Sequence, residues 1–161
     1  MTAGLPRALR GFTLVELVVT VAIVGVLATV TLPLAQLTVQ RHKEQELRVA
    51  LRQIRDALDA YKKAADEGRV LRRADETGYP RTLQVLVAGV EDAKRLDRRK
   101  IYFLRRLPRD PFADPAADPA QSWGKRSYAS PPDAPTEGAD IYDVYSLAAG
   151  TGLNGIPYRS W

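Results

Sequence analysis

A long apolar run near the start of the chain places the strongest constraint on its fold. From Phe12 to Leu37 the only ionisable side chain is Glu16. At about 1.5 Å per residue, a helix over this run is longer than the hydrocarbon core of a bilayer, which is about 30 Å thick. We therefore predict a transmembrane helix over residues 12–37. A charge inside such a helix costs about 2.5–3.5 kcal/mol, so Glu16 needs a compensating partner.

The segments on both sides of the run carry positive charge. Arg7 and Arg10 precede it without any acid, and Arg41-His42-Lys43 follows it. Charge on both sides leaves the positive-inside rule ambiguous. The short basic leader is typical of a signal n-region, which stays in the cytoplasm. We therefore expect a single-pass membrane protein whose C-terminal part lies on the far side of the membrane from the leader.

Two ordinary interpretations of this run compete with each other. A secretory signal peptide has an apolar region of only about 7–15 residues and carries no acid in it. A plain signal anchor, which holds a soluble domain at the membrane, accounts for the length of the run. It gives Glu16 no role.

The residues that open the run form a specific motif. Gly11-Phe12-Thr13-Leu14-Val15-Glu16-Leu17 follows the short basic leader and begins the predicted span. In this context the motif resembles the type III signal sequence of type IV pilins and of the pseudopilins of type II secretion. The resemblance implies that a prepilin peptidase cleaves between Gly11 and Phe12. It also implies that the same enzyme then methylates the new N-terminal residue, Phe12.

Cleavage at this position would give Glu16 a partner. It leaves an ammonium group at Phe12, and a buried charge becomes tolerable when it is paired with its opposite. Glu16 can pair with the amine of its own chain or with that of a neighbouring copy. The second pairing is a head-to-tail contact, which builds an open helical filament unless it closes into a ring. We therefore predict that Glu16 and Phe12 form an assembly site.

Gly25 and Pro33 interrupt the apolar helix. Proline removes a backbone donor and clashes with the preceding turn. We predict a helix break at these two residues, which in a filament would let the rod extend. The alternative is a harmless kink, since both residue types are common in membrane helices.

An amphipathic arm is predicted over residues 38–68. No proline occurs from Leu34 to Tyr79, so span and arm are expected to form one long helix that ends near Gly68. The stripe is shorter than four heptads, which favours packing under a globular domain over a coiled coil. Its apolar residues recur in steps of four and three, the spacing of one helical face: Leu47, Leu51, Ile54, Leu58, Tyr61 and Ala65.

Residues 69–161 are expected to form one small periplasmic domain. A short helix is predicted from Leu83 to Val87, ending near Gly89. Residues 100–104 are predicted to form a strand or a turn. Two further strands are predicted over residues 127–129 and 141–147. The predicted fold is α+β and pilin-like, with one long N-terminal helix packed against a small antiparallel sheet of about three strands.

Motifs in this domain extend the resemblance to the G-type pseudopilins of type II secretion. The motifs are Leu107-Pro108-Arg109-Asp110-Pro111-Phe112, Trp123-Gly124, Asp143-Val144-Tyr145-Ser146 and Trp161. The resemblance implies a structural subunit that polymerises from the inner membrane into a pseudopilus and drives protein export. The implied partners are further copies in a helical filament, other pseudopilins, the prepilin peptidase, an inner-membrane assembly platform and the lipid bilayer.

The chain departs from this family in one loop. G-type pseudopilins typically bind calcium through an acidic loop after the last strand, but residues 148–155 hold no carboxylate here. Calcium takes about six to eight oxygens, several of them from carboxylates. Asp140 and Asp143 would contribute only by pointing towards the loop, with Thr151 and Asn154 as neutral donors.

We therefore expect no calcium and no other cofactor. The glycine-rich loop is instead predicted to be held by its own hydrogen bonds and by Tyr158 and Trp161.

Other chemistry has little support in the composition. The chain has no cysteine and one histidine, His42, and no catalytic grouping stands out, so we expect no enzyme. The net charge of +5 and the basic cluster over residues 94–106 raise the question of nucleic acid. The cluster lacks a recognised nucleic-acid-binding fold, so no nucleic-acid partner is expected.

Two other functions remain open. One is a minor pilin of a type IV pilus or of a DNA-uptake pseudopilus, against which the absence of a C-terminal cysteine pair argues. The other is a membrane-tethered periplasmic binding module, in which the span is only a tether. In every case the predicted order is a cleaved leader (1–11), the span (12–37), the arm (38–68) and the globular domain (69–161).

Overall fold

The structure is a computed structural model that describes residues 11–161, apart from the side chains of residues 29–34. The chain divides into two compact units, Met1–Gln40 and Arg41–Trp161. Helix α1 (Leu14–Asp66) begins in the first unit and supplies the long helix of the second. The prediction of one long N-terminal helix is confirmed.

Helix α1 ends close to the predicted position. Gly68 follows its last residue by two positions and has a φ of +71°, in the left-handed region that favours glycine. Its N–H donates to the carbonyl of Ala65 over 3.0 Å, and the N–H of Arg69 donates to that of Ala64 over 2.9 Å. These bonds satisfy the last free carbonyls of the helix, as is common at helix ends.

The apolar stripe of α1 forms the centre of the core in the second unit. Five of the six predicted stripe residues are buried, and Tyr61 is half-buried. Burying each large aliphatic side chain stabilises the fold by about 1.5–3 kcal/mol. The side chains that cover this face of the helix come from later segments of the chain: Leu83, Leu86, Trp123, Ile141, Val144 and Tyr158.

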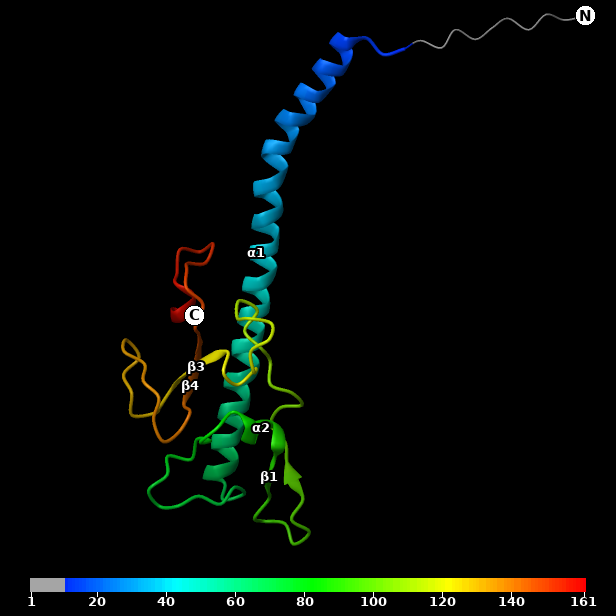
Figure 1. The fold of residues 1–161 in the computed structure, drawn as a ribbon. Coiled ribbons are helices and arrows are strands. Elements are labelled where there is room, and N and C mark those ends of the chain that lie inside the picture. The colour runs from blue at the N-terminus through cyan, green and yellow to red at the C-terminus, as the bar shows by residue number, and fades with distance from the viewer. Residues whose placement is uncertain (1–10) are drawn as a thin grey trace, which may run out of the picture. The chain divides into compact units, whose positions relative to one another are not determined.

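Five short elements follow α1 before the last turn. Helix α2 (Gln84–Ala88) is followed by its C-cap Gly89, near which the helix was predicted to end. The strands are β1 (Val90–Glu91), β2 (Lys100–Ile101), β3 (Trp123–Arg126) and β4 (Asp143–Ser146). A single 3₁₀ turn, η1 (Tyr158–Ser160), lies near the C-terminus. Figure 1 shows α2 and β1 beside the C-terminal end of α1.

The strands pair differently from the prediction. In the described part of the chain they form two antiparallel two-stranded sheets, β1–β2 and β3–β4, instead of one sheet of about three strands. The predicted strand over residues 127–129 is wrong, because these residues form a turn after β3. The α+β class, with a long helix and small antiparallel sheets, is confirmed.

Cross-strand packing explains why β3 lies earlier than predicted. Gly124 pairs with Tyr145 in the register of β3 and β4. A Cβ at Gly124 would lie 2.2 Å from Cε2 of Tyr145, so the tyrosine ring occupies the space that a side chain would need. Only glycine fits beneath this ring. Because glycine is unfavourable inside strands, the sequence pattern did not indicate a strand at this position.

Candidate functional site

The first turn of α1 carries the predicted assembly residue. Residues 11–13 precede the helix, and the Thr13 hydroxyl accepts a hydrogen bond of 3.2 Å from the N–H of Glu16. Thr13 is therefore the N-cap of α1, and the Thr13–Glu16 spacing is that of a capping box, of which this bond is one half. An acid in the first turn also complements the positive end of the helix dipole. The N-cap role of Thr13 was missed in the sequence, although the Thr-x-x-Glu spacing is typical of a helix start.

Glu16 and Phe12 remain available for an intermolecular contact. Both residues are exposed. None of the residues described by the structure forms an ion pair with Glu16. The local cap uses the backbone N–H of Glu16 and leaves its carboxylate free of that bond.

The first unit exposes an apolar surface. From Phe12 to Leu27 its large apolar side chains are between 49% and 80% exposed. Helix α1 passes through Gly25 without a break, so loosening at this glycine remains a prediction for the filament. Pro33 lies among residues 29–34, outside the described side chains.

The predicted span, residues 12–37, includes residues 29–34, whose side chains lie outside the description. Across the side chains that are described, no helix combines the length and the apolar character needed to cross a membrane.

The residues considered as calcium ligands are held by different partners in the structure. The Asp140 carboxylate is buried and accepts hydrogen bonds from the hydroxyls of Thr77 and Ser127 and from the N–H of Tyr128. Burial favours a higher pKa for Asp140, but these three donors outweigh it and hold the pKa below its usual value. Its oxygens thus serve residues outside the glycine-rich loop.

Asp143 is held by arginines instead. Its carboxylate lies 2.8 Å from Nε of Arg55 and 3.7 Å from Nη2 of Arg126. Arg55 also donates to the backbone oxygens of Val144 and Trp161, over 3.2 and 2.8 Å. One α1 side chain therefore joins β4 to the C-terminal segment, with the planar donor geometry that suits arginine.

The other two candidate calcium ligands belong to the glycine-rich loop itself. Asn154 Oδ1 accepts a hydrogen bond from the N–H of Ile156 over 3.0 Å. Thr151 forms an isolated antiparallel β-bridge with Pro157. No cluster of three or more His, Cys, Asp or Glu side chains suited to a metal ion occurs among residues the structure describes.

A buried glutamate on α1 anchors the glycine-rich loop. Glu44 is only 4% exposed, and its Oε1 accepts hydrogen bonds from the N–H of Leu153 (2.8 Å) and from the Tyr158 hydroxyl (3.0 Å). The indole of Trp161 donates to the carbonyl of Ile156 over 3.1 Å. These contacts hold the loop in the described structure through Tyr158 and Trp161, as predicted, and through Glu44, which was missed. A usable signal existed, because Glu44 precedes Leu47 by three residues and so lies in phase with the apolar stripe.

The motifs that carry the G-type resemblance meet in space. Ser146 Oγ donates to Asp110 Oδ2 over 2.5 Å, with both side chains buried. The Trp123 indole donates to the carbonyl of Pro108 over 2.9 Å. Phe112 stacks on Tyr158 with ring centroids 4.4 Å apart. These residues tie the loop after residue 107 to β3, β4 and η1.

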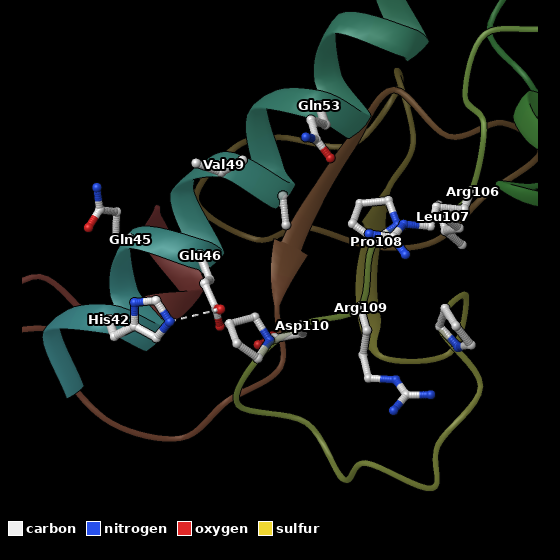
Figure 2. A pocket seen from close by; sticks show the side chains of 13 residues that line it. His42, Gln45, Glu46, Val49, Gln53, Arg106, Leu107, Pro108, Arg109 and Asp110 are labelled. Atoms are coloured by element: carbon white, nitrogen blue, oxygen red, sulfur yellow. Dashed lines mark ion pairs between the residues drawn. The ribbon is translucent and has the colours of Figure 1, made fainter. Parts of the chain in front are cut away.

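A groove of about 750 Å³ lies between α1 and this loop. Figure 2 shows the α1 side chains of His42, Glu46 and Val49 on one side and residues 106–110 on the other, with His42 Nε2 3.2 Å from Glu46 Oε1. Apolar groups in its lining come from both sides: Val49, Ala50, Leu107, Pro108, Pro111 and Pro119.

Comparison with known proteins settles the family. The prokaryotic N-terminal methylation motif matches residues 7–32. Type II secretion system core protein G of Klebsiella pneumoniae is 33% identical over 107 residues, which cover 64% of this chain and 69% of that protein. The chain belongs to the type II secretion system core protein G family. The family predicted from the motifs is confirmed.

Other members of the core protein G family match similar or longer stretches. The Pseudomonas aeruginosa protein is 31% identical over 113 residues, covering 68% of this chain and 72% of its own. The Vibrio cholerae protein is 29% identical over 147 residues, covering 89% of this chain and 82% of its own. No solved structure is significantly similar to this member of the family.

Proposed function

We propose that this chain is a structural subunit of a type II secretion pseudopilus. It polymerises from the inner membrane and drives the export of other proteins, and it carries out no catalysis itself. Membership of the core protein G family supports this proposal. The observation that carries it is Glu16, an exposed carboxylate in the first turn of α1, directly behind the motif for N-terminal methylation.

The exposed apolar residues of the first unit support a membrane and then a filament as their surroundings. A helix that is apolar on all sides needs lipid or other chains around it. We propose that residues 12–37 span the inner membrane before assembly, with the second unit in the periplasm. Neighbouring copies then replace lipid, and Glu16 of one copy pairs with the amine of Phe12 in the next.

Processing at Gly11 would create that amine. We propose that a prepilin peptidase cleaves after Gly11 and methylates Phe12, which keeps the positive charge. Mass spectrometry of the chain purified from its native membrane is expected to show an N-terminal methylphenylalanine. A mature chain that still begins at Met1 would contradict the proposal.

Export of secreted proteins tests the function itself. In cells that lack the wild-type chain, Glu16→Ala is expected to be processed and inserted normally yet to restore no export. Glu67→Ala, which removes an exposed glutamate at the other end of α1, is the matched control and should restore export in full. Full export with Glu16→Ala, or a defect only in pili or DNA uptake, would overturn the proposal.

The same proposal leaves calcium without a structural role. We propose that the hydrogen bonds of Glu44 and of the loop residues hold the glycine-rich loop without a metal ion. The placement of Asp140 and Asp143 on other partners supports this.

A further inference from the structure

The tip of the β1–β2 hairpin presents an exposed leucine. Leu96 is fully exposed, at the turn between the two strands. The base of the hairpin is fixed, because the buried Asp92 carboxylate lies 2.7 Å from Nη2 of Arg69 and the N–H of Ala93 donates to the Arg69 carbonyl over 2.8 Å. The leucine is therefore held outward by a tied loop, where it is open to contact with another surface.

Positive charge surrounds this leucine. Residues 69–73 and 91–100 contain eight Lys or Arg and three Asp or Glu, a net charge of +5 that equals the net charge of the whole chain. The positive and negative charges in the rest of the chain therefore cancel. A leucine inside the basic end of the domain calls for an apolar pocket with acids at its rim.

The groove beside α1 has an apolar lining, together with Arg106 and Arg109, and an acidic segment adjoins it in the sequence. Val49 in its lining is 49% exposed, and several further apolar groups line it with Val49. The adjoining segment, residues 110–122, contains three acids and no Lys or Arg. Of these acids, Asp114 and Asp118 are exposed, and each uses one oxygen to cap a turn. Arg109, which also lines the groove, donates to the carbonyl of Pro115.

We propose that Leu96 of one copy of this chain docks into the groove of a second copy. In this proposal the basic hairpin faces Asp114 and Asp118, in the acidic segment that adjoins the groove. This inference rests on the proposed filament and adds to it a second contact, between the globular domains. The donor and acceptor surfaces differ, so the contact is heterologous and continues from copy to copy.

The two surfaces lie at different heights along α1. The hairpin is tied to the chain just beyond Asp66, whereas the helix residues of the groove lie between His42 and Gln53. At 1.5 Å per residue the two positions differ by about 27 Å along the helix. For the hairpin of one copy to reach the groove of another, two copies with parallel helices must be shifted by about this length along the helix axis. Such a shift occurs between copies that are stacked in a rod.

Cross-linking tests the contact directly. The chain has no cysteine, so disulfides report only on introduced pairs. Leu96→Cys combined with Val49→Cys, oxidised in membranes of cells that assemble the pseudopilus, is expected to give a ladder of dimers, trimers and longer species. The matched control pairs Val49→Cys with Leu71→Cys, another exposed leucine at the same end, and should give none.

A charge exchange provides a second measurement. Arg98→Asp with Arg99→Asp, or Asp114→Arg with Asp118→Arg, should each lower the cross-linked fraction by about tenfold, because like charges then face each other. Combining all four substitutions should restore it. Failure of the combination to restore cross-linking would overturn the pairing of these two surfaces.

The outcomes separate this contact from the proposed function. If Glu16-dependent export persists but no ladder forms, the docking proposal fails and the pseudopilus proposal stands. A ladder with Leu71→Cys in place of Leu96→Cys overturns the choice of the hairpin tip. Leu96-dependent binding to phosphatidylglycerol vesicles, or to an acidic exported protein, without a ladder shows that another partner covers this leucine and overturns the proposal.

Discussion

At the scale of single residues, Asp140 shows how neighbours fix the charge of a buried carboxylate. Burial favours a higher pKa, but donors from Thr77, Ser127 and Tyr128 lower the pKa below its usual value. Because this pKa is lower in the folded chain than in the unfolded one, the stabilisation is complete above the unfolded value of about 3.9. It is lost as the pH falls through the folded value.

Asp140→Asn is therefore expected to be destabilising in a pH-dependent way. At pH 7 the free energy of unfolding should fall by about 1–3 kcal/mol, since charge-assisted hydrogen bonds are lost. The difference from the wild type should shrink as the pH falls below about 3.9. Urea unfolding of the full-length chain in detergent, at several pH values, measures this. An equal loss at every pH, or an equal loss in the exposed control Asp133→Asn, would contradict it.

Glu44 is a second residue whose role depends on its partners. Glu44→Ala leaves the N–H of Leu153 and the hydroxyl of Tyr158 without this acceptor. Tyr158 is buried, and a buried donor that loses an acceptor costs about 1–3 kcal/mol, so a lower unfolding temperature is expected. Glu46→Ala, two residues away and exposed, removes only a surface pair with His42 and should change little. Equal unfolding temperatures for the two variants would refute the anchoring role.

At the scale of elements, the glycine-rich loop after β4 is held to α1 by side chains. Calcium at millimolar concentration, or a chelator, is therefore expected to leave the unfolding temperature of the full-length chain unchanged. A metal that binds only the folded state would raise it. Thermal unfolding followed by circular dichroism gives the answer, and a rise of several degrees with calcium that a chelator reverses would contradict the metal-free loop.

Elements governed by local periodicity could be predicted from the sequence. The stripe from Leu47 to Ala65 and the helix end near Gly68 depend on residues close together in the chain, and both are confirmed. The start of β3 depends on Gly124 fitting beneath Tyr145, a contact between distant residues. No local pattern contains that contact, so the strand was placed too late. The two separate sheets escaped prediction for the same reason.

The candidate sites divide in the same way. The motif from Gly11 to Glu16 is a run of neighbours, so the family could be identified before any fold was known. The bonds of Arg55 to Asp143 and to Trp161 join residues far apart in the chain, and they appear only once α1 and β4 are packed together. The groove beside α1 also needs the folded loop after residue 107.

At the scale of the whole molecule, we propose two kinds of contact between neighbouring copies of this chain. In the first, Glu16 would pair with the amine of Phe12 and join the apolar helices; in the second, Leu96 would join the globular domains. The first contact is the central claim, because without it the apolar helix would only tether a domain.

Electron microscopy of filaments tests that claim most directly. When the chain is overproduced with its secretion machinery, the wild type is expected to form rods. Glu16→Gln, with an equally processed and methylated N-terminus by mass spectrometry, is expected to form none, because a neutral amide cannot neutralise the neighbouring ammonium group. Rods of normal number and length from Glu16→Gln would contradict the account.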